Sequence, residues 1–79
     1  MIEKKELLRE LQDLLEAEEQ VLALCARQLG NAAFFSGISP QNRPDVHAGL
    51  EAFQARSQQH RQTIIHIMAG IVSGGRDVY

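Results

Sequence analysis

Apolar residues recur at alternating spacings of three and four in two segments of this chain, which a break rich in glycine and proline separates. The first series contains Leu8, Leu11, Leu15, Glu18, Leu22, Cys25, Leu29 and Ala32. The second series contains Val46, Leu50, Phe53, Ser57, His60, Ile64, Ile67 and Ile71. Positions spaced in this way return to one side of an α-helix, as in helices that pack along one another. The pattern predicts an all-α fold, an antiparallel two-helix hairpin with a coiled-coil-like seam.

Glycine and proline set the expected boundaries within a single domain. The first segment has no proline, and no glycine before Gly30, and it is rich in the helix formers Leu, Glu, Gln, Ala and Arg. Gly37, Pro40 and Pro44 mark the break, and Ser73-Gly74-Gly75 ends the second segment. For the domain 1–79 we expect a helix over 2–33, a loop over 34–43, a helix over 44–72 and a flexible tail over 73–79.

Folding the second helix back on the first gives a hypothetical register for the two seams. A slip of one heptad would also keep the seams facing each other. The predicted layers are Leu29–Val46, Cys25–Leu50, Leu22–Phe53, Glu18–Ser57, Leu15–His60, Leu11–Ile64 and Leu8–Ile67.

The layers around Glu18, Ser57 and His60 interrupt an otherwise apolar seam. A buried carboxylate is costly without a partner, so we expect Glu18 to pair with His60 and the layer to fix the register.

A metal site is the other interpretation, because Glu on one helix and Glu-x-x-His on the next is the ligand pattern of ferritin-like di-iron bundles. The chain is similar to that pattern, with Ser57 in place of the second Glu. A homodimeric four-helix bundle would bring together two Glu18 and two His60, enough for one divalent metal ion. Otherwise no cofactor is expected.

Further apolar residues lie beside both seams. Leu7, Leu14 and Val21 repeat every seven residues beside the seam of the first segment, and Ile65, Met68 and Val72 lie off the seam of the second. A chain of 79 residues builds only a small core. An exposed apolar stripe of this extent indicates a protein partner, so we expect the hairpin to complete a bundle with another chain or by homodimerisation.

Composition and charge narrow the classes of function. The net charge of −2 does not favour nucleic acid, which binds to clustered basic residues. The longest apolar stretch, from Ile64 to Val72, is too short to span a membrane. Cys25, the single cysteine, lies at a seam position and should behave as a small hydrophobe, and no catalytic motif is present. With no signal peptide expected at the N-terminus, we expect a cytoplasmic, non-enzymatic protein.

The stretch Thr63-Ile-Ile-His-Ile-Met-Ala-Gly70 resembles the closing segment of the type III secretion needle co-chaperones, the small cytoplasmic E component. Gly37-Ile-Ser-Pro40 resembles the turn of that family. The resemblance implies a two-helix hairpin that packs on a larger helical-repeat chaperone and helps keep a secretion needle subunit soluble before export. It makes Ile64, Ile65, Met68 and Ala69 candidates for the contact. With the residues chosen from periodicity, the predicted interface is Leu7, Leu14, Val21, Ile64, Ile65, Met68, Ala69 and Val72.

Overall fold

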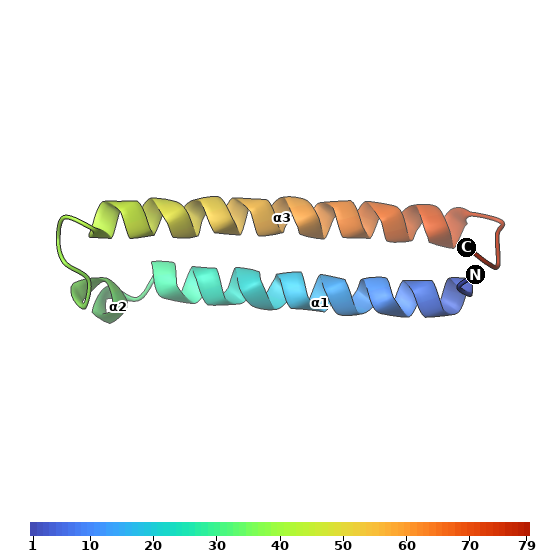
Figure 1. Ribbon diagram of the computed structural model, residues 1–79, viewed down its shortest axis with the longest axis horizontal. Coiled ribbons are helices and arrows are strands. Elements are labelled where there is room, and N and C mark those ends of the chain that lie inside the picture. The colour runs from blue at the N-terminus through green and yellow to red at the C-terminus, as the bar shows by residue number, and fades with distance from the viewer.

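The computed structural model describes all 79 residues as a long, thin helical hairpin (Figure 1). Helix α1 spans Lys4–Leu29, the short helix α2 spans Ala32–Ser36, and α3 spans Arg43–Ser73. The two long helices run antiparallel and pack side by side, and both termini lie at the end opposite the turn. The molecule measures 55 × 18 × 15 Å. The predicted all-α hairpin is therefore confirmed.

Asn31 divides the predicted first helix into two. The side-chain Oδ1 of Asn31 accepts hydrogen bonds from the backbone N–H groups of Ala33 at 3.1 Å and Phe34 at 3.2 Å. Such N-capping begins a new helix, so α1 ends at Leu29 and α2 follows it, whereas the sequence predicted one helix to residue 33. Part of the predicted loop 34–43 is consequently helical.

Arg43 connects the turn to the start of α3. Its Nε donates to the carbonyl oxygens of Phe35 at 2.8 Å and Ile38 at 2.9 Å, and its Nη2 donates to that of Ser36 at 3.3 Å. The carbonyls of Phe35 and Ser36 lie at the end of α2, where helix carbonyls lack partners within their own helix, and Ile38 lies just beyond it. Pro44 follows in the first turn of α3, where a missing N–H carries no penalty.

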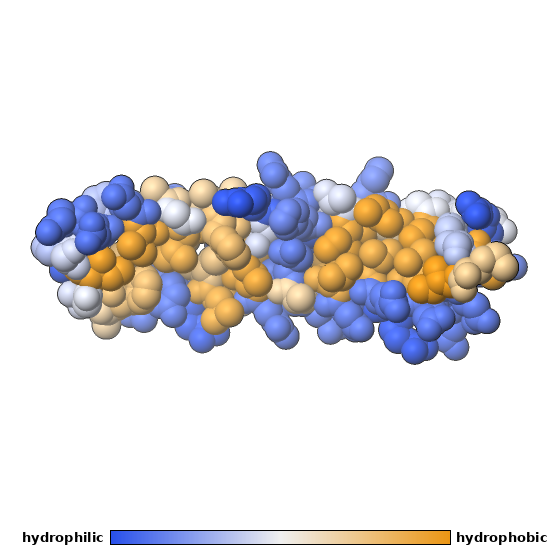
Figure 2. All heavy atoms as spheres, in the orientation of Figure 1, coloured by the Kyte–Doolittle hydropathy of each residue, from blue (hydrophilic) through white to orange (hydrophobic).

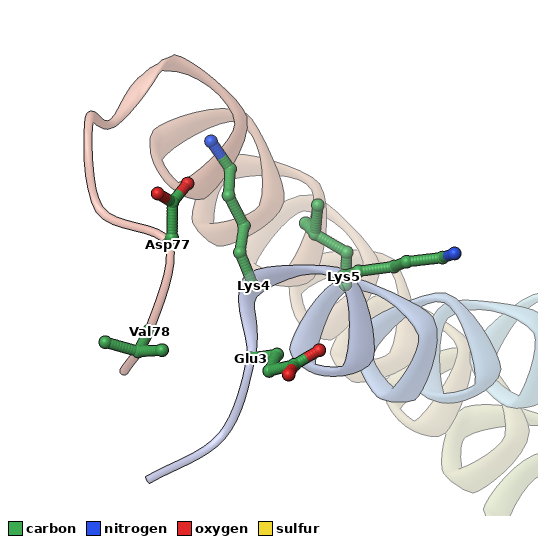
Figure 3. Close-up of a pocket in the computed structure, with 6 residues that line it drawn as sticks. Glu3, Lys4, Lys5, Asp77 and Val78 are labelled. Carbon is green, nitrogen blue, oxygen red and sulfur yellow. The ribbon is translucent and has the colours of Figure 1, made fainter.

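The C-terminal tail folds back onto the N-terminus rather than extending away from it. Glu3 and Val78 form an isolated antiparallel bridge, with Ile2 and Tyr79 exchanging two backbone hydrogen bonds of 2.8 Å. Lys4 extends from the first turn of α1 toward the end of α3 (Figure 3). Its Nζ donates to the carbonyl oxygens of Gly74 at 3.0 Å and Val72 at 3.3 Å. The segment predicted as a flexible tail thus makes specific contacts across the open end of the hairpin.

The predicted seam of α1 agrees with the burial of its side chains. Cys25 is buried, and the other α1 members of the series are all partly buried; they are Leu8, Leu11, Leu15, Glu18, Leu22 and Leu29. Ala32 is exposed, because it belongs to α2.

Three predicted seam positions of α3 are wrong. Phe53, His60 and Ile67 are exposed, whereas the residues that directly follow them are only partly exposed; these are Gln54, Arg61 and Met68. The inward series of α3 is therefore Val46, Leu50, Gln54, Ser57, Arg61, Ile64, Met68 and Ile71. Gln and Arg fit this series because their aliphatic stems cover apolar surface while their polar ends reach solvent. Consequently His60 lies beside the seam, not in the predicted layer with Leu15.

The interior of the hairpin is very small. Only Cys25, Ser57 and Ile71 are buried, and no large side chain is fully enclosed. Two helices cover only one stripe of each other's surface, so most apolar residues outside the seam remain in contact with solvent.

Candidate functional site

Two polar contacts between α1 and α3 lie at the middle of the hairpin. His60 Nδ1 and Glu18 Oε1 are 3.2 Å apart, which confirms the predicted pair, and Arg61 Nε lies 3.8 Å from Glu19 Oε1. The side chain of His60 is 58% exposed and that of Glu18 is 25% exposed. The pair is therefore a partly solvated contact beside the seam and not a buried polar layer.

These contacts identify the two sides of the hairpin. Successive residues of a helix point about 100° apart, so Glu18 and Glu19 leave the seam of α1 in opposite directions. The same holds for His60 and Arg61 on α3. Since Glu18 contacts His60 and Glu19 contacts Arg61, one contact lies on each side. We call them the His60 side and the Arg61 side.

The His60 side carries apolar residues from both long helices. Leu14 lies one turn before Glu18, and Leu7 and Val21 lie seven residues before and after Leu14; Phe53 and Ile67 lie seven residues before and after His60. Such spacings keep side chains on one face of a helix. Along this side, Leu7, Leu14 and Ile67 are near the termini, Glu18 and His60 are in the middle, and Val21 and Phe53 are nearer the turn.

The space-filling view of one face shows the same order. Hydrophobic atoms gather across both long helices near the termini, a hydrophilic band crosses the middle, and a second hydrophobic group lies toward the turn (Figure 2). Leu14, Phe53 and Ile67 are among the most exposed large hydrophobic residues of the molecule.

The Arg61 side is apolar on α3 and polar on α1. Ile65 lies one turn after Arg61, and Ala69 and Val72 follow it at helical spacing; all three are exposed. On α1, this side presents Gln12 and Glu19. The eight predicted interface residues therefore do not form one continuous surface. Leu7, Leu14 and Val21 lie on the His60 side, Ile65, Ala69 and Val72 lie on the Arg61 side, and Ile64 and Met68 lie partly buried between them.

A hollow of about 200 Å³ lies beside the Glu18–His60 pair. Its lining residues are Glu18, Val21, Phe53, Arg56, Ser57 and His60. A protein-bound metal of this class takes three or four protein ligands, and a single chain supplies two, which hydrogen-bond to each other. Arg56 lines the same hollow, and its positive charge disfavours a cation there. The residues of one chain therefore do not fit a metal ion.

A second hollow, of about 480 Å³, opens at the terminal end. Its lining residues are Glu3, Lys4, Lys5, Leu8, Asp77 and Val78. Lys4 reaches α3, whereas Lys5 points away from the tail (Figure 3). Its lining carries charges of both signs and includes both the start of α1 and the tail. The hollow therefore belongs to the contact between the termini that closes the hairpin.

Phe53 and Ile67 are exposed apolar residues of the His60 side that the sequence assigned to the seam and not to an interface. The signal that points to them is the inward series of α3, which continues through Gln54, Arg61 and Met68 and leaves the preceding residues outside. No family model, curated protein or solved structure matches this chain. None of its helices is both long enough and apolar enough to cross a membrane.

Proposed function

We propose that this chain is a non-enzymatic assembly module that packs on a larger helical chaperone through its Arg61 side. The observation that carries the proposal is the exposure of Ile65 and Val72, which are held one side chain away from the seam of a regular helix. Val72 is 62% exposed. A partner helix laid along this side would cover both residues together with Ala69.

The physical support is the hydrophobic effect acting on a preformed surface. Burying apolar area contributes about 25 cal/mol per Å², and helices that dock in a groove use anchors spaced by three, four and seven residues. Ile65, Ala69 and Val72 have these spacings. The long helix already holds them in place, so little conformational entropy is lost on binding.

The nature of the partner follows from the resemblance to needle co-chaperones. Two of the residues that the resemblance favours, Ile65 and Ala69, lie exposed on the Arg61 side. The proposed partner is accordingly a helical-repeat chaperone, and the shared task is to keep a secretion needle subunit soluble before export. The hairpin stabilises the chaperone and makes no catalytic contribution.

Photocrosslinking in the native host tests this function. A photoreactive residue at Val72 should crosslink to one larger protein, identified by mass spectrometry as a helical-repeat chaperone, and Ile65→Glu should remove the product. The matched control is the same photoreactive residue at Asp13, which is exposed on the outer face of α1. Equal products from both positions, or a product of another class, would contradict the proposal.

A further inference from the structure

We propose that the His60 side binds a second copy of this chain and forms a two-fold symmetric, four-helix bundle. The two hairpins would lie face to face with their termini at the same end, so that α1 of each copy packs on α3 of the other. This association uses the side opposite to the one proposed for the chaperone, and either can hold without the other.

In this arrangement the apolar residues of the His60 side of one copy face the apolar residues of the same side of the other copy. A two-fold axis parallel to the long helices leaves each residue at the same distance from the terminal end. The apolar residues near the termini of one copy therefore meet the same residues of the second copy. Leu14 of one copy then faces the region of Ile67 of the other, and Val21 faces the region of Phe53. The hydrophilic bands around Glu18 and His60 also meet each other, which leaves no charged band against an apolar one.

Charge favours this pairing of unlike helices. On this side α1 presents Glu18, with Glu10 at helical spacing from Leu7 and Leu14, and α1 has no Lys or Arg between Arg9 and Arg27. On the same side α3 presents His60 and Arg56, which line the hollow beside Glu18, and α3 has no acidic residue from residue 52 to its end. Packing α1 on the partner's α3 therefore brings opposite charges together. The reversed two-fold arrangement, with the axis across the hairpin, would instead pack acidic α1 on acidic α1 and set the apolar terminal end against the turn.

The glycines of α3 provide room for a close neighbour on this side. Gly49 lies one turn before Phe53, and Gly70 lies one turn after Ile67. A Cβ atom built on either residue meets nothing within 4 Å. Glycine weakens a helix interior and permits close approach of another backbone, and these two positions are on the flank where α1 of a second copy would lie.

The available area is sufficient for a stable dimer. The broad face of the hairpin measures 55 by 18 Å, a footprint on the order of 1,000 Å² per copy. Standard protein–protein interfaces bury roughly 800 Å² per partner. The face is therefore large enough for specific association of two copies, whereas either helix alone offers much less.

Sedimentation equilibrium of the full chain tests the association with two matched variants. Ile67 is 44% exposed on the His60 side, and Ile65 is 41% exposed on the Arg61 side of the same helix. The wild type should form dimers. Ile67→Glu should raise the dissociation constant more than about tenfold, because a carboxylate would be buried against apolar side chains. Ile65→Glu should leave it within about threefold, and circular dichroism should show that both variants keep their helix content.

A monomeric wild type at millimolar concentration would overturn the proposal, and so would an equal loss of dimer in both variants. Neither result bears on the chaperone contact, which is read from the crosslink at Val72. A functional failure would appear in the reverse way, with the dimer intact and that crosslink missing.

Spin-label distances test the orientation of the two copies. Labels are placed at Glu6→Cys near the termini and, separately, at Gln41→Cys in the turn, both in a Cys25→Ser background. With like ends together, each pair of labels should be within about 30 Å, a few interhelical spacings of about 10 Å. The reversed arrangement would separate each pair by nearly the 55 Å length of the hairpin. Long distances at both positions would overturn the proposed symmetry.

Discussion

Arg43 shows how much of the turn depends on one side chain. Its guanidinium reaches three carbonyl oxygens, those of Phe35 and Ser36 at the end of α2 and that of Ile38 just beyond it. Arginine presents several donors in a rigid plane, whereas lysine carries one compact ammonium group. The geometry of the turn therefore depends on the shape of this side chain as well as on its charge.

We predict that Arg43→Lys lowers the free energy of unfolding by about 1–2 kcal/mol, because at least one partly buried carbonyl loses a charged donor. Urea denaturation at fixed protein concentration measures the change. Arg56→Lys is the control, since no hydrogen bond or ion pair involves the Arg56 side chain within the chain. Equal stability of the two variants would show that the Arg43 contacts contribute nothing specific.

The Glu18–His60 contact should contribute little to the stability of a single hairpin. Its members are partly exposed, and pairs of this kind typically contribute 0.2–1 kcal/mol. A double-mutant cycle with Glu18→Gln and His60→Gln, measured at micromolar concentration, should give a coupling energy within that range. A single hairpin supplies only two ligands here, so zinc should not raise the melting temperature of the wild type relative to the doubly substituted chain at concentrations where sedimentation shows a monomer. A zinc-dependent rise confined to the wild type would instead identify the pair as metal ligands.

Among the elements, α1 was more predictable than α3, for a physical reason. The inward positions of α1 are almost all apolar, so its hydrophobic pattern and its buried face coincide. The inward face of α3 includes Gln54 and Arg61, whereas Phe53 and Ile67 stay outside. A pattern based on residue type selects the apolar neighbours, because it cannot recognise that long polar side chains cover a seam with their stems.

The same limit applies to the candidate site. The sequence predicted the pairing of Glu18 with His60 and the surplus of apolar residues. It did not predict that this surplus divides between two sides, because the division depends on which residue of each adjacent pair turns inward. Neither the cap at Asn31 nor the bridge between the termini follows from periodicity, since each is a local hydrogen-bonding arrangement.

At the open end of the hairpin, the C-terminal tail should hold the start of α1 and the end of α3 together through its backbone hydrogen bonds. We predict that ending the chain at Gly74 accelerates amide exchange at Lys4, whose N–H donates to the Asp77 carbonyl at 2.8 Å. Loss of the backbone bridge should also lower stability by about 1 kcal/mol. Hydrogen exchange followed by NMR measures the first effect. Val78→Ala, which keeps the backbone bonds, is the control, and unchanged exchange in the shortened chain would contradict the prediction.

At the scale of the whole molecule, the elongated shape is the reason for which we propose association with other chains. A hairpin 55 Å long with three buried residues cannot enclose a core of its own. Stability in small domains comes from burial, and here much of the surface available for burial lies on two outward sides. We therefore expect a chain built in this way to gain stability by associating, in directions that the polar outer face of α1 limits.

The melting temperature of the full chain should therefore depend on its concentration. When folding is coupled to dimer formation, a 100-fold rise in concentration favours the folded dimer by about 2.7 kcal/mol at 25 °C. For a dimer of chains this size, that corresponds to an increase of about 5–10 °C. Circular dichroism at 222 nm across this range measures it. Ile67→Glu should abolish the dependence while Ile65→Glu preserves it, because only the first lies on the His60 side. A wild-type melting temperature that stayed constant over the whole range would show that the hairpin folds as a monomer.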